Sequence, residues 1–440
     1  MKRKPIDPEL LRDRLAAEQG KQYWRSLDEL AGDPAVTAML QREFPDGASE
    51  WTDPVSRRQF LMLMGASLAL AGATGCRPPT GKVIPFVRPP EDNRIPGKAL
   101  YYATAMPLGG FATGLLVESN EGRPTKIEGN PLQSTSLGGT SPLHQGATLG
   151  LYDPDRSRAV MYRQQTRTWN EVIQVLRRRL NGNKGEGFAF VTDTIGSPTL
   201  AAQMDEFKKQ YPAAKFYRHE PINDDNALLG SELAFGRRVH SYAKLENADV
   251  IVSLESNFLA EGPGQLVYSR AFAKRRRRDD QGRVGGERGM SRLYVIETDL
   301  TVTGANADNR LALKPSDVEA FTFALAAKLG VAGAEAPKLS EEATKYVEAI
   351  AKDLKARKPG STIVLVGEGS SPAVHAVGHA INAALGNVGQ TLVYTDPLLP
   401  EKELATQSIR DFAAALGKGE IDTVVFMGTK PAYSSPADLN

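Results

Sequence analysis

The chain is poor in the residues that bind metals. Its 440 residues include one cysteine, Cys76, and five histidines. One thiol cannot form an internal disulfide, and it cannot supply the several thiolates that an iron–sulfur cluster or a Cys-rich zinc site needs. Only His375 and His379 are spaced to share a helix face. The small apolar residues around them predict a packed helix rather than a metal site.

The chain also lacks an excess of either charge. Lys and Arg total 54 against 52 Asp and Glu, and the formal net charge of +2 gives no reason to expect a nucleic-acid partner. Hydrophobic residues make up 41% of the sequence, which is enough for two or three domains with real cores. The most apolar stretch, residues 61–73, is shorter than the roughly 20 residues that a transmembrane helix needs.

A paired-arginine motif precedes that apolar stretch. Arg57 and Arg58, within Ser-Arg-Arg-Gln-Phe-Leu, followed by the apolar run and small residues, are typical of a twin-arginine export signal. We therefore expect the twin-arginine translocase to carry the folded protein out of the cytoplasm. A buried core helix and an uncleaved membrane anchor are the alternatives for this segment.

Cys76 follows directly after small residues, as the cysteine of a lipoprotein processing site does. Ala73 stands where a larger aliphatic residue is usual, so an incidental free thiol is the alternative to acylation. A single acyl chain holds a protein to a membrane only weakly, which means that a lipid-anchored form needs a second chain or a membrane partner. The expected location is the periplasmic side of the bacterial cytoplasmic membrane.

The pattern of the rest of the chain predicts an α/β protein with a small β module. The expected parts are a polar extension (1–55), the signal with a possible lipobox (56–76), a linker (77–98), the β module (99–160) and an α/β region (161–440). Within residues 100–119 the side chains alternate in the pattern of a β-strand, and the turn at 120–124 predicts an antiparallel hairpin. Further on, buried apolar strands alternate with helices, which indicates parallel sheets covered on both faces; these strands are expected at 188–192, 215–217, 249–254, 293–297, 362–366 and 423–427.

Parallel sheets bind ligands at the carboxyl ends of their strands. Gly367, Gly369 and Ser370 follow one such strand and precede a helix, where free N–H groups could hold a phosphate, and they are weak cofactor-binding candidates. An empty structural loop is the alternative. The basic run 274–278 lacks interleaved aromatic residues and predicts a solvated loop, with an anionic headgroup or an acidic subunit as the other possible contact.

Several motifs resemble the molybdopterin oxidoreductase family. They are the Gly-Arg-Pro-Thr-Lys-Ile-Glu-Gly-Asn-Pro hairpin at 122–131, Tyr-Asp-Pro-Asp-Arg at 152–156, the helix start at Thr168-Trp169, the acidic strand end at 297–299 and the helix entry at 314–317. The resemblance covers roughly residues 100–440. It implies Rossmann-like parallel-sheet lobes after the small β module.

The chain departs from that family at the cofactor. Family enzymes carry a four-cysteine iron–sulfur site in the first module, whereas residues 100–150 contain no cysteine, and the glycine of the family's helix entry is missing at Ser316. We therefore expect no catalytic residue, no metal and no cofactor in this chain. If it were instead an active molybdenum enzyme, only Ser256, Asn257 or Asp193 could ligate the metal from strand-end loops.

The cluster-less body, the delayed export signal and Cys76 together resemble the iron–sulfur subunit of alternative complex III, a membrane-bound quinol-oxidising complex. The resemblance implies a scaffold with membrane, multihaem cytochrome and iron–sulfur partners, and it places iron–sulfur clusters only in a missing C-terminal part or a partner. It also implies that the chain continues after the loop at 429–438. A periplasmic molybdenum oxidoreductase and a lipid-anchored binding protein without a redox role are the alternatives.

Overall fold

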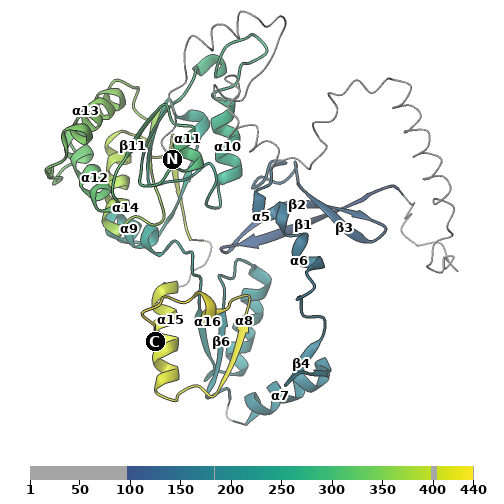
Figure 1. Cartoon of the computed structure of the whole chain (residues 1–440). Coiled ribbons are helices and arrows are strands. Elements are labelled where there is room, and N and C mark those ends of the chain that lie inside the picture. The colour runs from purple at the N-terminus through teal and green to yellow at the C-terminus, as the bar shows by residue number, and fades with distance from the viewer. Residues whose placement is uncertain (1–96, 183, 398–403, 440) are drawn as a thin grey trace, which may run out of the picture. The chain divides into compact units, whose positions relative to one another are not determined.

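The computed structural model describes residues 97–182, 184–397 and 404–439 (Figure 1). The chain divides into two units, Met1–Pro90 and Glu91–Asn440, and every described residue belongs to the second. The export signal with Arg57 and Arg58, the candidate acylation site Cys76 and most of the linker therefore lie outside the described residues. Among the described residues, no helix combines the length and the apolar character that a membrane span requires.

The described part begins with the antiparallel module that the sequence predicts. Strands β1 (Leu100–Leu108), β2 (Phe111–Asn120) and β3 (Arg123–Gly129) lie in that order. Glu121 and Gly122 connect β2 to β3 with φ values of 53° and 85°, the positive pair that a two-residue hairpin turn favours. Four short elements follow: α5 (Pro142–Gly146), α6 (Leu149–Tyr152), β4 (Val160–Tyr162) and β5 (Gln165–Arg167).

A three-stranded parallel sheet comes next, in the order β14-β6-β7. It consists of β6 (Phe188–Thr192), β7 (Lys215–Arg218) and β14 (Thr423–Met427). One face carries stacked aromatic rings from Phe190 and Phe216, against which Phe207 of α8 (Pro198–Gln210) packs edge-on. On the other face, Phe412 of α15 (Ala405–Gly417) joins the buried cluster that contains Val191. The sheet is thus covered on both faces, as its apolar strands predict.

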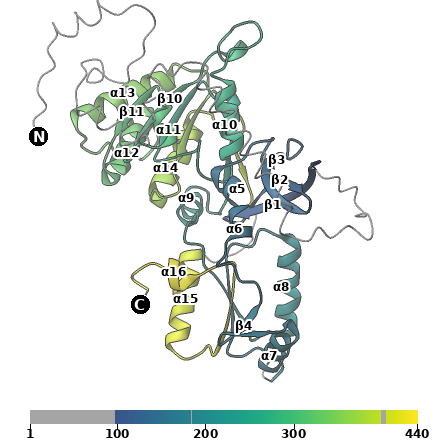
Figure 2. The same ribbon diagram turned by 45° about the vertical axis from the view of Figure 1, so that its right-hand side comes forward.

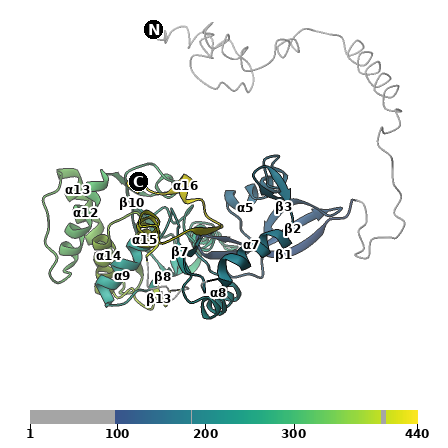
Figure 3. The ribbon, with the colours of Figure 1, turned by 90° about the horizontal axis from the view of Figure 1, so that it is seen from below.

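A four-stranded parallel sheet forms the larger core, in the order β11-β10-β9-β12. Its strands are β9 (Val250–Leu254), β10 (Arg292–Glu297), β11 (Asn309–Ala312) and β12 (Thr362–Val366). Alternate side chains of β9 enter two separate clusters, one with α12 (Pro315–Leu329), α13 (Glu341–Lys355) and α14 (Pro372–Ala384), the other with α10 (Gln265–Lys274). Helices α12 and α13 pack side by side (Figure 3).

We call each parallel sheet with its covering helices a lobe. The remaining elements belong mostly to the second lobe, which is built on the four-stranded sheet. They are α9 (Asp225–Phe235), the antiparallel pair β8 (His240–Ala243) and β13 (Leu392–Thr395), α11 (Val302–Ala305) and the 3-10 turns Leu245–Asn247 and Gly286–Arg288. The chain then returns to the first sheet as α15, β14 and α16 (Pro431–Ser434), and Figure 2 shows α15 and the teal helix α8 on opposite sides of the strands. Residues 161–440 therefore contain two parallel sheets, and the chain visits the first one twice.

The prediction of a solvated loop for the basic run 274–278 is wrong for two of its arginines. Arg275 is 4% exposed, and its guanidinium donates to the carbonyl oxygens of Glu246, Ala248 and Gly289 and pairs with Asp249 at 2.8 Å. Arg276 lies over the ring of Phe272 and pairs with Asp308. These two side chains fasten the end of α10 to the sheet, whereas Arg277 and Arg278 are exposed as predicted.

Candidate functional site

The carboxyl ends of β9 and β12 open onto a cavity of about 210 Å³. Residues 255–257 follow β9 and residues 367–368 follow β12, so the two strand-end loops form one wall. His375 and His379 contribute from α14, and Tyr268 contributes from α10. This is the edge at which parallel sheets bind ligands, as the sequence predicts.

A second cavity of about 580 Å³ adjoins the first and shares Phe111, Asp224 and Glu368 with it. The tip of the β1–β2 hairpin, residues 108–111, forms part of its lining. Gly110 of that tip lies against the loop after β6, because a Cβ on Gly196 would stand 1.9 Å from the Gly110 carbonyl oxygen. The cavity is thus bounded by the β module and by loops from both parallel sheets, and its volume suits a small molecule.

The smaller cavity is lined by acidic groups. Its carboxylates come from Asp224, Glu255, Glu261 and Glu368, and its described lining contains no lysine or arginine. Burial and the negative charges of Asp224 and Glu261 raise the pKa of the Glu368 carboxyl, although that residue keeps part of its surface exposed. The Glu261 carboxylate accepts a hydrogen bond from Asn257 at 2.7 Å. An anion entering this cavity would meet repulsion rather than a counter-charge.

The two arginines of the larger cavity are already paired. Arg218 lies 3.7 Å from Asp225, and Arg238 lies 2.9 Å from Glu232. A molybdopterin guanine dinucleotide carries a diphosphate, which needs cations or several free N–H donors. The volume would admit part of such a cofactor, but the charge of the lining does not fit it.

The packing of the strand-end loops explains the glycine at position 367 without any ligand. A Cβ at this position would stand 1.9 Å from the carbonyl oxygen of Glu255, so glycine is needed for the close approach of the two strand-end loops. Gly369 lies in open space, and the Ser370 hydroxyl is buried without a hydrogen-bond partner among the described residues; neither residue lines either cavity. The role of these three residues in cofactor binding stays a prediction.

The N-terminus of α14, the helix after this loop, is capped by the side chain of Ser371. The Ser371 hydroxyl accepts a hydrogen bond from the backbone N–H of Val374, and it donates one to Glu319 at 2.8 Å. Pro372 occupies the first position of α14 and has no N–H to offer. The N-terminus of α14 is therefore less open to a phosphate than the sequence pattern indicates.

Of the two histidines of α14, His375 is buried and His379 is half-buried. Burial lowers the pKa of both His375 and His379 to about 4, and the neighbouring His379 lowers that of His375 further. His379 Nδ1 lies 3.0 Å from the Tyr394 hydroxyl, while His375 Nε2 is buried without a partner in the described part of the chain. Among the described residues, no group of three or more His, Cys, Asp or Glu side chains is arranged to hold a metal.

The three possible metal ligands of the molybdenum alternative do not meet. Ser256 and Asn257 line the smaller cavity, whereas Asp193 follows β6 in the other sheet, next to Gly428. Burial and the charge of Glu220 raise the pKa of Asp193. Ser256 and Asn257 at the smaller cavity and Asp193 in the other sheet therefore stay separate alternatives for a metal ligand.

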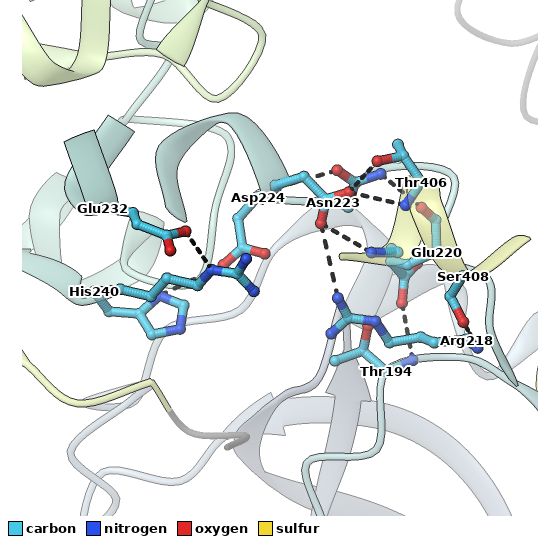
Figure 4. A network of polar contacts seen from close by, with 12 residues as sticks. Thr194, Arg218, Glu220, Asn223, Asp224, Glu232, His240, Thr406 and Ser408 are labelled. Atoms are coloured by element: carbon cyan, nitrogen blue, oxygen red, sulfur yellow. Dashed lines mark hydrogen bonds and ion pairs between the residues drawn. The ribbon is translucent and has the colours of Figure 1, made fainter. Parts of the chain in front are cut away.

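A polar network that the sequence analysis missed joins the two lobes (Figure 4). Asp225 is 3% exposed in the first turn of α9, and its carboxylate accepts hydrogen bonds from the backbone N–H groups of Ala405 and Thr406 and from the Thr406 hydroxyl at 3.1, 2.9 and 2.6 Å. Arg218 pairs with it, and the Arg218 backbone N–H donates to Ser408. Asp225 thereby fixes the start of α15 where the chain returns to its first sheet.

Comparisons with known proteins bear on this arrangement. No family model matches the chain. It is similar to a curated protein of Nitratidesulfovibrio vulgaris, "Menaquinone reductase, molybdopterin-binding-like subunit". The two are 24% identical over 435 residues, an alignment that covers 87% of this chain and 60% of the relative. The similarity supports the resemblance to molybdopterin-oxidoreductase-like proteins. The chain spans about 60% of the length of that relative.

Solved structures also match the chain, with low sequence identity. Acetylene hydratase from Pelobacter acetylenicus shares 12% sequence identity with a TM-score of 0.38, over 66% of this chain and 42% of that protein. The α/β architecture rests on the strands and sheets described above.

Proposed function

We propose that this chain is a cofactor-free, molybdopterin-enzyme-like scaffold in a membrane-bound, quinone-linked respiratory complex of the alternative complex III type. The observation that carries the proposal is the charge of the strand-end cavities: carboxylates line the place where a dinucleotide cofactor would need cations, and the two arginines there are paired. The relative's name supports both the molybdopterin-enzyme-like character and the link to quinone, because it describes a molybdopterin-binding-like subunit of a menaquinone reductase.

The proposal assigns electron transfer to other parts of the complex. With one cysteine in 440 residues, the chain cannot hold a Cys-ligated cluster by itself. Its own residues would instead build rigid lobes, through the two sheets and the Asp225 network, that hold membrane, multihaem cytochrome and iron–sulfur partners in position. Iron–sulfur clusters would lie in further sequence or in a separate subunit.

The proposed location is the periplasmic face of the membrane. Arg57 and Arg58 would direct export by the twin-arginine translocase, and acylated Cys76 would anchor the mature protein. Mass spectrometry of the membrane fraction should find an acylated peptide that begins at Cys76. A peptide that runs unmodified through Cys76 in the mature protein would contradict the lipid anchor.

A deletion and complementation experiment tests the function. Membranes from a strain that lacks this protein should lose quinol-dependent reduction of the periplasmic acceptor, and the full chain expressed in trans should restore it. The purified full chain alone should not oxidise quinol. Unchanged quinol oxidation in the deletion strain would contradict membership in the complex, and quinol oxidation by the isolated chain would contradict a scaffold role. We propose the quinol-oxidising direction from the resemblance, whereas the relative is named for quinone reduction.

A further inference from the structure

Helix α7 (Trp169–Asn181) presents apolar side chains to solvent. Trp169 is 72% exposed and Ile173 is 41% exposed, and the two lie one turn apart on the same face of the helix. Only Leu180, near the other end, is buried. The apolar face of an amphipathic helix is normally covered by the rest of its domain. In the described part of the chain, the first two turns of α7 therefore carry an apolar face that is left exposed.

The β4–β5 hairpin extends this face. It is joined to α7 through Thr168 alone, and the two elements lie side by side in Figures 1 and 2. Met161 is 55% exposed and Tyr162 is 56% exposed. We define the arginine–aromatic patch as the side chains of Met161, Tyr162, Arg163, Arg167, Trp169 and Ile173.

Arginines frame the exposed ring of Tyr162. The guanidinium carbons of Arg163 and Arg167 lie 5.3 and 6.0 Å from the ring centroid, within the range of a cation–π contact. Arg167 also lies 3.6 Å from Glu171, whose carboxylate closes the N-terminal capping box of α7 with Thr168. The charged groups of the patch are thus held in place before any partner arrives, which lowers the entropy cost of binding.

The segment around the patch has a strong charge asymmetry. Residues 153–179 have a formal net charge of +4, whereas the whole chain has +2. All of the positive charges are arginines, which pair with carboxylates through two parallel hydrogen bonds more readily than lysines do. The arginines are Arg156, Arg158, Arg163, Arg167, Arg177, Arg178 and Arg179, and the acids are Asp153, Asp155 and Glu171.

We propose that the arginine–aromatic patch is the docking surface for an acidic protein subunit. Carboxylates of the partner would pair with the arginines, and an apolar surface of the partner would cover Trp169 and Tyr162. Trp, Tyr and Arg are the residues that most often dominate binding energy at protein interfaces. The partner's identity as a subunit of the respiratory complex rests on the proposed function.

A protein fits the patch better than an anionic membrane does. Gln164, Gln165 and Asn170 are exposed beside the aromatic side chains, and such amides suit the directional hydrogen bonds of a protein interface.

The test uses the tagged full chain, isolated from its own membranes in a mild detergent. Trp169→Ala combined with Tyr162→Ala, and separately Arg163→Glu, should each lower the recovery of the same acidic subunit by about tenfold or more, since truncated hot spots commonly cost that much affinity. Tyr433→Ala and Lys345→Glu are the matched controls, because both side chains are exposed far along the chain from the patch, at 91% and 70%. They should leave recovery unchanged.

The possible results separate the two proposals. If the wild-type chain brings its subunits with it and the patch variants keep all of them, the docking surface is wrong while the proposed function stands. If the patch variants lose a basic subunit instead of an acidic one, the docking-surface proposal is also wrong. If the wild-type chain brings no subunit, both proposals fail. Binding of the partner-free full chain to phosphatidylglycerol vesicles that is lost in the Trp169→Ala/Tyr162→Ala variant would assign the patch to the membrane instead. Thermal unfolding of each variant should match the wild type, because these exposed residues contribute little to stability.

Discussion

Strand β9 and strand β1 are both rich in apolar residues, yet the structure buries one and exposes the other. All five residues of β9 are buried, whereas seven of the nine residues of β1 are exposed. The reason is position: β9 lies between β10 and β12 with helices on both faces, while β1 is the edge of a three-stranded sheet and, among the described strands, pairs only with β2. Burial follows from what covers a strand as much as from its sequence.

The same contrast extends to the parts of the chain around these strands. The second sheet concentrates its apolar residues in two interior clusters, whereas residues 100–175 keep large apolar side chains such as Tyr101, Leu132 and Trp169 on the surface. Large apolar patches that remain exposed commonly mark sites of protein association. We infer that the second sheet supplies stability and that the region before residue 180 supplies contacts.

The first prediction compares one residue from each region. Phe321→Ala in α12 removes a side chain with no exposed surface and should lower the free energy of unfolding by about 3–5 kcal/mol. Tyr101→Ala in β1, where the side chain is 59% exposed, should change it by less than about 0.5 kcal/mol. Urea denaturation followed by circular dichroism measures both. Equal losses in the two variants would remove the contrast between a stabilising and a contacting region.

The second prediction separates two neighbouring arginines. Arg275→Ala leaves Asp249 and three carbonyl oxygens without their buried partner and should cost about 3 kcal/mol. Arg277→Ala, two residues away and exposed, should stay within about 0.5 kcal/mol of the wild type. The same denaturation experiment measures both. A small loss for Arg275→Ala would show that this buried charge does not fasten α10 to the sheet.

The third prediction concerns how acid affects stability through the two histidines of α14. The folded pKa of His375 and of His379 is about 4, below the ordinary value of 6.5, so the unfolded chain binds more protons below pH 6.5 and stability falls as the pH decreases toward 4. Between pH 7 and 5.5 the loss should be about 1 kcal/mol per histidine. His379→Gln should reduce the slope of stability against pH. An unchanged slope would contradict the lowered pKa of this half-buried ring.

The sequence predicts the parallel strands well because each is a short apolar run between helical segments, whether it is buried throughout, like β9, or only half-buried, like most of β14. Residues 188–192, 362–366 and 423–427 form strands with the predicted bounds. Their division between two sheets could not be predicted, since β14 pairs with β6 from more than 200 positions earlier and apolar runs carry no pairing information. Hydrophobic pattern also gave no sign that Arg275 is buried, because its partners are mostly backbone carbonyls.

The candidate site was predicted only in outline. The strand-end position follows from the parallel sheet, and Ser256 and Asn257 do line the cavity there. Its acidic character depends on Asp224 and Glu261, which come from loops distant in sequence from Glu368. The Asp225 network was missed for a similar reason, as its partners lie 180 residues away. Charge complementarity of this kind is a property of the folded chain.

The metal and pterin content of the full chain, isolated together with its complex, decides between a cofactor-free scaffold and an enzyme. We expect haem and iron from partner subunits, with no molybdenum, tungsten or pterin above background, because the strand-end cavities offer carboxylates where the cofactor's phosphates would need cations. Elemental analysis and pterin fluorescence of the oxidised extract measure this in one preparation. Stoichiometric molybdenum or tungsten with a pterin would contradict the scaffold and make the chain a molybdenum or tungsten enzyme.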